Sequence, residues 1–269
     1  SAASDVYKRQ SMSSVEHITS RQNPLVGHIR RLNASRAYRR ERGEFVCDGP
    51  KLLAEALRWG AEITAVVAEE GRSVPCPPGA REVSVPAELL KSLSTTETPQ
   101  GVLFLCRAPD LSAPDKLTGA RYLVLDGVQD PGNVGTVWRT ADAFGADGLI
   151  LLPGCADPFS PKTVRATMGA CFRLPVWEME RETLTARLTD AALPLYATAL
   201  RADTEDVRRA DLRRCAVVIG SEGKGVSEET LALCGQTLKI PMRARCESLN
   251  AAVAASVVLW EMARSGLSI

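Results

Sequence analysis

The sequence has only two histidines, His17 and His28, and its eight cysteines include no C-x-x-C pair. Zinc sites usually need closely spaced Cys or His ligands, and a Ser-His-Asp triad needs a histidine in the catalytic part of the chain. Both histidines lie near the N-terminus, far from any pair of cysteines. We therefore expect no metal site and no such triad, and we interpret the cysteines as buried, reduced thiols of a cytoplasmic protein.

Long apolar runs are also missing. The longest, residues 251–260, is too short for a membrane-spanning helix, which needs roughly 20 apolar residues, so no membrane partner is expected. Residues 1–11 precede Met12 and lack the apolar stretch of a signal peptide, and we interpret them as a disordered or non-native leader. The formal net charge is only +1, although a balanced total can hide a local patch.

Residues 20–42 contain such a patch, with seven arginines against a single acid, Glu41. After Asn23 and Pro24, apolar residues follow a rough helical spacing, which predicts a helix whose other faces are basic. This pattern is typical either of a solvated helix surface or of a surface that follows the phosphates of a nucleic acid. On the second interpretation, the RNA-binding residues are Arg21, Arg30, Arg31, Arg36, Arg39 and Arg40.

The chain divides into two halves. Residues 12–108 alternate short strands and helices, which predicts a small α/β domain, and the Pro- and Gly-containing stretch 109–120 predicts a linker. In residues 121–269, short apolar runs alternate with helical patterns, which favours a second α/β domain with buried parallel strands. The strands expected in this second domain are residues 122–126, 148–152, 173–176, 195–199, 216–219 and 237–240.

The loop DPGNVG follows the strand that ends at Asp126 and leads into a helical run over residues 134–144. Ligands of open α/β sheets bind at the carboxyl ends of parallel strands. Asn133 and Arg139 are separated by close to two helical turns, so both would face one crevice if the helix begins near Asn133. Taken alone, the pattern also fits Asn133 as a helix cap and Arg139 as a surface charge.

The stretch GSEGKGVS, residues 220–227, superficially resembles a phosphate-binding loop. A Walker A loop needs a hydroxyl residue directly after its lysine, whereas Lys224 is followed by Gly225. The G-x-G-x-x-G fingerprint of dinucleotide-binding proteins is missing too, which argues against an ordinary oxidoreductase. What is left is a glycine-rich turn that can approach a ligand closely, with Glu222 at its centre.

The last informative stretch begins at Ile240, which closes a predicted strand. Ser248 is the expected N-cap of the following helix, which is apolar on most faces and should be buried nearly all round. Ser248 and Asn250 in its first turn would bind a polar ligand group.

Together, three blocks resemble the SpoU (TrmH-type) branch of the SPOUT RNA methyltransferases: N-V-G-x-x-x-R-T-A at 133–141, I-G-S-E-G-x-G at 219–225 and I-P-M…E-S-L-N-x-x-V-A at 240–254. The N-terminal half resembles the small ribosomal-protein-like RNA-binding domain of many members. The resemblance implies a deep trefoil knot in the C-terminal parallel-sheet domain, S-adenosylmethionine as cofactor, and a homodimer whose sites use both subunits. Trp260 and the last helix are candidates for the dimer interface. Ala244 departs from the pattern, because members commonly have glycine there.

The resemblance further implies transfer of a methyl group to a ribose 2′-hydroxyl of RNA. The substrate favoured is ribosomal RNA; a transfer RNA 2′-O-methyltransferase and a catalytically inactive RNA-binding relative remain alternatives. Arg139 would activate the hydroxyl with help from an RNA phosphate, because a guanidinium does not ordinarily accept a proton. The expected catalytic residues are Arg139, Asn133, Glu222, Ser248 and Asn250, and the expected cofactor-binding residues are Thr198, Gly220, Ile240 and Leu249.

Overall fold

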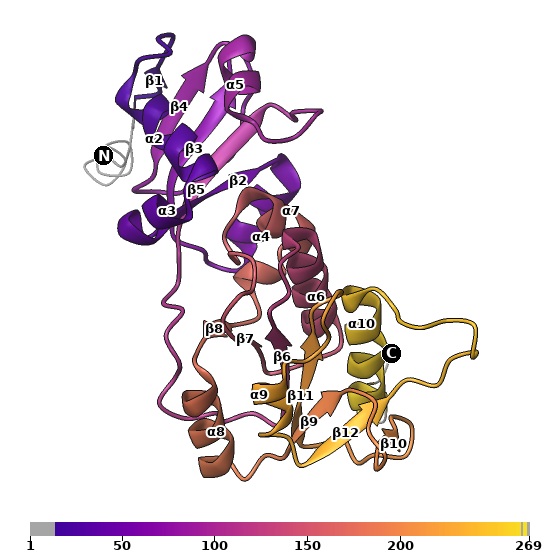
Figure 1. Ribbon diagram of the computed structural model, residues 1–269. Coiled ribbons are helices and arrows are strands. Elements are labelled where there is room, and N and C mark those ends of the chain that lie inside the picture. Colours follow the sequence, from indigo (N-terminus) through magenta and orange to yellow (C-terminus); the bar gives the residue numbers. More distant parts are fainter. Residues whose placement is uncertain (1–13, 265, 268–269) are drawn as a thin grey trace. The chain divides into compact units, whose positions relative to one another are not determined.

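The computed structural model describes residues 14–264 and 266–267, and it forms two compact units. The first unit extends to Pro109 and includes Phe159–Pro161, and the second holds Asp110–Pro158 and the chain from Lys162 onward (Figure 1). The leader predicted for residues 1–11 lies outside the described residues.

The first unit is built on a mixed five-stranded sheet with the order β1-β4-β3-β5-β2. β3, β4 and β1 are parallel neighbours, whereas β5 is antiparallel to both β3 and β2. Its core forms where apolar residues of α2 and α5 meet one face of this sheet. The elements are β1 (Glu16–His17), α2 (Pro24–Ala34), α3 (Arg36–Arg42), β2 (Glu44–Asp48), α4 (Pro50–Arg58), β3 (Ile63–Glu69), β4 (Arg81–Val85), α5 (Ala87–Leu93) and β5 (Val102–Arg107).

The basic segment forms two helices, where the sequence predicted one helical run. Asn23 caps α2, since its side chain accepts a hydrogen bond from the Leu25 N–H at 2.9 Å, and Pro24 occupies the first helical turn. Ser35 has extended backbone and accepts from the Tyr38 N–H at 3.1 Å, so it ends α2 and caps α3.

The second unit contains a seven-stranded, wholly parallel sheet with the order β10-β12-β9-β11-β6-β7-β8. The prediction of buried parallel strands is confirmed: all six residues of β11 are buried. The elements are β6 (Arg121–Asp126), α6 (Pro131–Ala143), β7 (Gly148–Leu151), α7 (Pro161–Thr167), the 3-10 turn η1 (Ala170–Phe172), β8 (Val176–Glu178), α8 (Arg181–Asp190), β9 (Leu195–Thr198), β10 (Glu205–Asp206), β11 (Cys215–Gly220), α9 (Glu228–Leu231), β12 (Gln236–Lys239) and α10 (Ala251–Ala263).

Several local predictions differ from the structure. The strand expected at 173–176 begins at Val176, because the Arg173 N–H still closes the preceding 3-10 turn on Ala170. The linker was expected at 109–120, and from Asp110 onward this stretch is part of the second unit: Leu117 belongs to its core, and the Leu111 carbonyl accepts from the Glu178 N–H. The short strands β1, β4 and β10 were not predicted, and their short, mixed polar sequences explain the omission.

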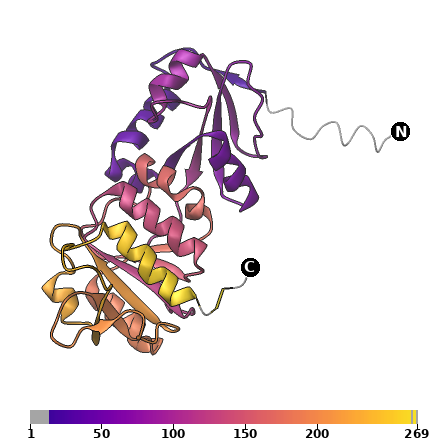
Figure 2. The same cartoon turned by 90° about the vertical axis from the view of Figure 1, so that its right-hand side faces the viewer.

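α10 lies beside α6, as Figures 1 and 2 show from two directions. Asn250, and not Ser248, caps α10, since its side chain accepts from the N–H groups of the first turn. The helix is also not buried all round, because Val253 is 49% exposed and Trp260 is 48% exposed in the single chain. None of the helices in the described part of the chain is long and apolar enough to cross a membrane.

Candidate active site

Three loops meet at the carboxyl edge of the parallel sheet. The loop after β6 leads into α6, the glycine-rich turn follows β11, and a long loop joins β12 to α10. β6 and β11 are direct neighbours that end together, with Asp126 opposite Gly220. This is the edge at which open α/β sheets bind ligands.

The glycine-rich turn doubles back on itself directly after β11. The Ser221 and Gly225 backbones exchange two hydrogen bonds, of 3.2 and 2.8 Å, and Gly225 has a φ of 68° that favours glycine. A Cβ on Gly220 would lie well under 3.0 Å from the Gly225 carbonyl carbon and the Val226 nitrogen. Only glycine at position 220 therefore lets the returning chain pass so close to the end of the strand.

Glu222, at the tip of this turn, joins the three loops. Its Oε1 accepts a hydrogen bond from Asn133 Nδ2 of α6 and another, at 3.1 Å, from Asn250 Nδ2. Asn250 Nδ2 also lies 3.3 Å from Asn133 Oδ1. The Oδ1 of Asn250 accepts a hydrogen bond from the Ala252 N–H at 2.8 Å. Three residues predicted as catalytic thus form one network, and Asn250 both caps α10 and holds the carboxylate.

A second set of polar contacts anchors the other end of the turn. The buried carboxylate of Asp126 accepts from the Ser227 N–H at 2.9 Å and from Ser227 Oγ at 2.8 Å. Arg181 Nη2, at the start of α8, lies 3.2 Å from the other Asp126 oxygen, and Arg181 Nε donates to Thr230 Oγ1 at 2.8 Å. Sequence reasoning did not single out Arg181, because no motif links it to a strand end 55 residues away.

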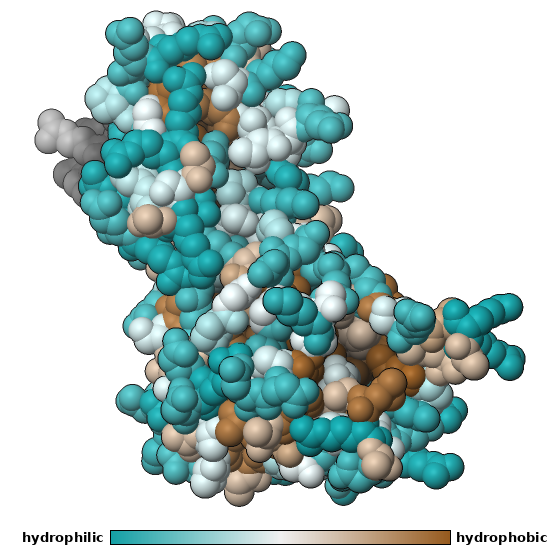
Figure 3. Space-filling view, viewed as in Figure 1, coloured by the Kyte–Doolittle hydropathy of each residue, from teal (hydrophilic) through white to brown (hydrophobic). Residues whose placement is uncertain are grey.

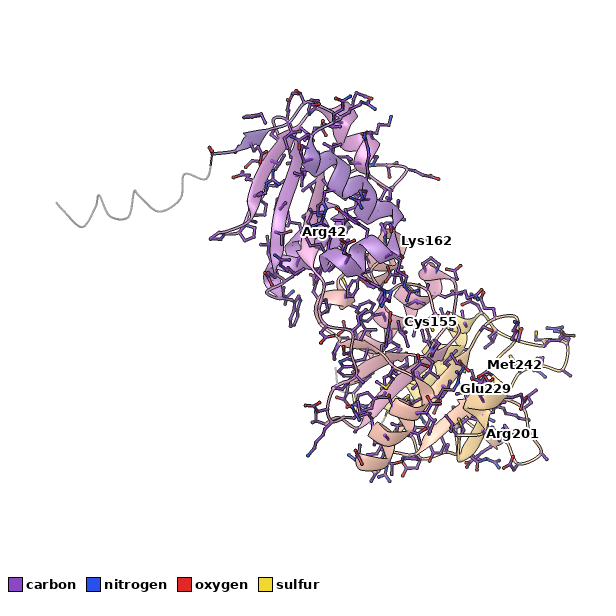
Figure 4. The ribbon with its side chains drawn as sticks, turned by 60° about the vertical axis from the view of Figure 1, so that its left-hand side comes forward. Arg42, Cys155, Lys162, Arg201, Glu229 and Met242 are labelled. Atoms are coloured by element: carbon purple, nitrogen blue, oxygen red, sulfur yellow. The ribbon has the colours of Figure 1, made fainter. Side chains whose placement is uncertain are left out.

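A pocket of about 260 Å3 lies between the turn, the end of β9 and the loop before α10. Ile219 and Leu238 contribute apolar side chains, and Ser221 and Ser248 contribute hydroxyl groups. Figure 3 shows apolar side chains gathered on this face of the second unit, and Figure 4 shows Met242 on the loop between β12 and α10. The lining includes all four residues predicted to bind the cofactor, Thr198, Gly220, Ile240 and Leu249, together with Glu222 and Ser248.

A more polar pocket of about 460 Å3 lies on the other side of the turn. Asp126 and Arg181 form part of its wall, and Gln129 and Lys224 lie at its exposed side. Glu222 lines both pockets, so its carboxylate stands between an apolar space and a polar one. A reacting group that approaches from the polar side would meet this carboxylate.

Arg139 does not join this cluster within one chain. α6 begins at Pro131, with Asp130 as its cap, and at 100° per residue Asn133 and Arg139 point about 120° apart around the helix. The Arg139 side chain is exposed, and no described residue forms a hydrogen bond or ion pair with its guanidinium. The prediction that Asn133 and Arg139 share one crevice is therefore wrong for a single chain.

Five of the six arginines predicted to bind RNA are exposed in the first unit, and Arg39 is not. Arg39 is buried, and its Nη1 donates to the Leu32 carbonyl at 2.6 Å, where α2 ends. The Arg39 guanidinium thus donates to main-chain carbonyls at the end of α2. Arg39 was predicted to bind RNA, and its burial removes it from the exposed surface.

The thiols near the sheet are protonated at neutral pH. Burial raises the pKa of Cys155 to about 11 and that of Cys215 to about 12. Cys246 in the loop before α10 is exposed, so the prediction of buried thiols is wrong there. No group of three or more potential metal-ligating side chains occurs among the residues described by the structure.

Comparisons with known proteins match both units. A family model described as the SpoU rRNA Methylase family matches residues 120–260, and one described as the MRM3-like substrate binding domain matches residues 23–103. A 23S rRNA (guanosine(2553)-2′-O)-methyltransferase of Bacillus subtilis is 30% identical over 251 residues, which are 92% of this chain and 99% of that protein.

Solved structures also match the chain over most of its length. The AdoMet-bound rRNA methyltransferase from Sinorhizobium meliloti is 34% identical with a TM-score of 0.82, over 94% of this chain and 99% of that chain. The methyltransferase AviRb from Streptomyces viridochromogenes, in complex with AdoMet, is 27% identical with a TM-score of 0.82, over 91% and 98% of the two chains.

Proposed function

This chain belongs to the SpoU rRNA methylase family, and from that premise we propose that it transfers a methyl group from S-adenosylmethionine to a ribose 2′-hydroxyl of ribosomal RNA. The observation that carries the proposal is the Asn133–Glu222–Asn250 network at the edge of a pocket formed by the Gly220 turn. The similar proteins from Bacillus subtilis and Streptomyces viridochromogenes are named for a guanosine and a uridine of 23S rRNA, which favours ribosomal RNA as the substrate class.

The residues present fit the adenosine part of S-adenosylmethionine. The volume of about 260 Å3 is slightly below the roughly 300–1,000 Å3 of common ligand pockets, which suits a nucleoside. Ile219, Leu238 and Ile240 would contact the faces of the adenine, and the absence of a side chain at Gly220 lets backbone groups approach its edge. Thr198 Oγ1 already donates to the Val218 carbonyl at 3.1 Å, so its oxygen remains available as an acceptor.

S-adenosylmethionine, when bound, supplies an electrophilic methyl group, so the protein has to orient the ribose and to favour loss of the hydroxyl proton. Glu222 is fixed by two side-chain amides, so its carboxylate can accept a hydrogen bond from the substrate ribose in a defined direction. Ser248, at the edge of the pocket, would add a hydroxyl contact. Arg139 would stabilise the negative charge that develops on the attacking oxygen.

Because Arg139 lines neither pocket of its own chain, we place it in the site of a second subunit. α6 and α10 expose an adjoining apolar surface: Val253 and Trp260 are about half exposed, and Trp260 packs edge-on against Phe144 with ring centroids 5.5 Å apart. Large exposed apolar residues on neighbouring helices favour an interface between copies of the chain. A homodimer joined there would bring Arg139 of one subunit towards the pocket of the other.

Mixed dimers of two inactive variants test this arrangement. Arg139→Ala and Glu222→Ala subunits, carrying different affinity tags, are co-expressed, and the heterodimer is assayed for methyl transfer to unmethylated 23S rRNA. If Arg139 acts across the interface, one site of the heterodimer is intact and about half of wild-type turnover returns. If it acts within its own chain, both sites carry one defect and turnover stays at the level of the parent variants.

The substrate is tested separately. Mapping of 2′-O-methyl positions in ribosomal and transfer RNA from cells with and without the gene should show one ribosomal position that depends on the gene. Loss of a methyl group from transfer RNA alone would overturn the ribosomal assignment.

The remaining proposals rest on the sequence and on family membership. We place the RNA-binding surface on α2 and α3 of the first unit, and the protein in the cytoplasm. We also propose a trefoil knot in the second unit, as the resemblance to the family implies.

A further inference from the structure

The ring of Tyr38 lies at the centre of a cluster in the first unit. The Arg31 guanidinium carbon lies 3.9 Å from the ring centroid, and that of Arg42 lies 5.3 Å from it. Arg31 comes from α2, whereas Tyr38 and Arg42 come from α3, and Figure 4 marks the place of Arg42. The Tyr38 side chain is only 6% exposed, whereas both arginines are exposed. One buried ring thus supports two surface guanidinium groups from different helices.

Hydrogen bonds fix the ring in this place. Tyr38 Oη lies 2.7 Å from His28 Nδ1, and His28 Nε2 lies 3.2 Å from Glu44 Oε1. Because an ionised carboxylate only accepts, His28 Nε2 carries the hydrogen towards Glu44, and in the neutral imidazole Nδ1 accepts from the Tyr38 hydroxyl. Thr64 Oγ1 donates to the second Glu44 oxygen at 2.6 Å. The chain of contacts runs from β3 through β2 and α2 to the ring in α3.

The carboxylate in this chain of contacts belongs to Glu44. Glu44 directs both of its oxygens to His28 and Thr64. Among the described residues, none forms a hydrogen bond or an ion pair with the guanidinium group of Arg31 or of Arg42. A guanidinium that stacks on a ring still presents its N–H groups at its edge, where they can form paired hydrogen bonds to phosphate oxygens.

We infer that Arg31 and Arg42, supported by Tyr38, form a phosphate-binding site for the RNA backbone, and that Tyr38 is its positioning residue. The inference rests on the proposed function, since it takes RNA as the partner. A stacked guanidinium loses less side-chain freedom on binding than one that is free in solvent. The two arginines therefore bind phosphate more strongly than equally exposed basic residues elsewhere in this unit, although Arg42 was not among the predicted RNA-binding residues.

The test compares two charge-matched double variants of the full-length protein. Arg31→Ala/Arg42→Ala removes the proposed site. Lys51→Ala/Arg58→Ala removes two exposed charges from α4, where Arg58 lies 5.7 Å from the centroid of an exposed ring, Trp59, and not of a buried one. Binding to a 23S rRNA transcript is measured by filter retention between 0.05 and 0.5 M KCl. Since each phosphate contact contributes about 0.7–0.9 to the slope of log K against log salt, the first variant should lower the slope by roughly 1.5 and weaken binding on the order of 30-fold at 0.1 M salt. The Lys51→Ala/Arg58→Ala variant should change the salt slope and the affinity by far less.

Tyr38→Leu tests the positioning role, because it removes no charge and yet should also lower the salt slope. Tyr38→Phe keeps the ring and should retain most of the slope of log K against log salt. If the leucine variant fails to fold, this result still shows that the ring, and not the hydroxyl, supports the arginines. Equal slopes for the two double variants would overturn the inference. A wild-type protein that does not bind the transcript would refute the proposed RNA function instead, and unchanged S-adenosylmethionine affinity in every variant separates the two results.

Discussion

A Gly220→Ala substitution should disrupt the pocket, because the new methyl group has no room beside the returning turn. Its Cβ would lie well under 3.0 Å from main-chain atoms of Gly225 and Val226. These neighbours are backbone, so they cannot rotate away as a flexible side chain does. β11 is a central strand whose residues are all buried, so the turn, and with it Glu222, has to move.

The expected effect follows from this contact. Overpacking a tight site costs about 1–3 kcal/mol, and a clash with backbone belongs at the upper end, near 3 kcal/mol. If this whole cost appears as a displaced turn in a protein that stays folded, affinity for S-adenosylmethionine falls on the order of 100-fold. If the cost instead lowers the free energy of unfolding, the melting temperature falls by roughly 6–12 °C, at about 2–4 °C per kcal/mol for a domain of this size.

Gly223→Ala provides the matched control in the same turn. A Cβ at Gly223 meets nothing within 4 Å, so this variant should stay within about 0.5 kcal/mol of the wild type. Cofactor affinity is measured by isothermal titration calorimetry and stability by scanning calorimetry. The reasoning would be refuted by a Gly220→Ala protein that matches Gly223→Ala in both measurements.

Two further predictions concern the second unit. Asp126→Asn removes the charge opposite Arg181 and should lower the free energy of unfolding by about 2–3 kcal/mol in urea titrations; an unchanged midpoint would contradict the proposed anchoring of the turn. At pH 8, Cys246 should account for the fast reaction of the native protein with a thiol reagent, because pKa values raised to about 11 for Cys155 and about 12 for Cys215 keep those thiols protonated. Cys246→Ser should abolish the fast phase, and a fast phase that persists would contradict this assignment.

Much of the architecture could be predicted from local patterns. Apolar runs with no polar alternation predicted buried parallel strands, and the run 216–219 forms the centre of β11. Asn23 followed by Pro24 predicted the start of α2 because both act on the first helical turn. The three spaced blocks predicted the family and three residues that line the pocket, Gly220, Ile240 and Leu249, since the chemistry of a site restricts both residue type and spacing.

Other features depended on contacts between distant segments. Ser248 and Asn250 are both good caps, and Asn250 is the cap in a structure where the same side chain also contacts Glu222. Arg36 and Arg39 look alike in the sequence, yet Arg39 is buried because carbonyls at the end of α2 accept its hydrogen bonds.

Sequence periodicity and residue chemistry therefore determined most of the elements, the family and the candidate site residues. The partners of each polar group were decided by the tertiary structure. A hydrogen bond depends on where the backbone places two groups in space, and Arg181 meets Asp126 only because the start of α8 and the end of β6 lie at the same edge of the sheet.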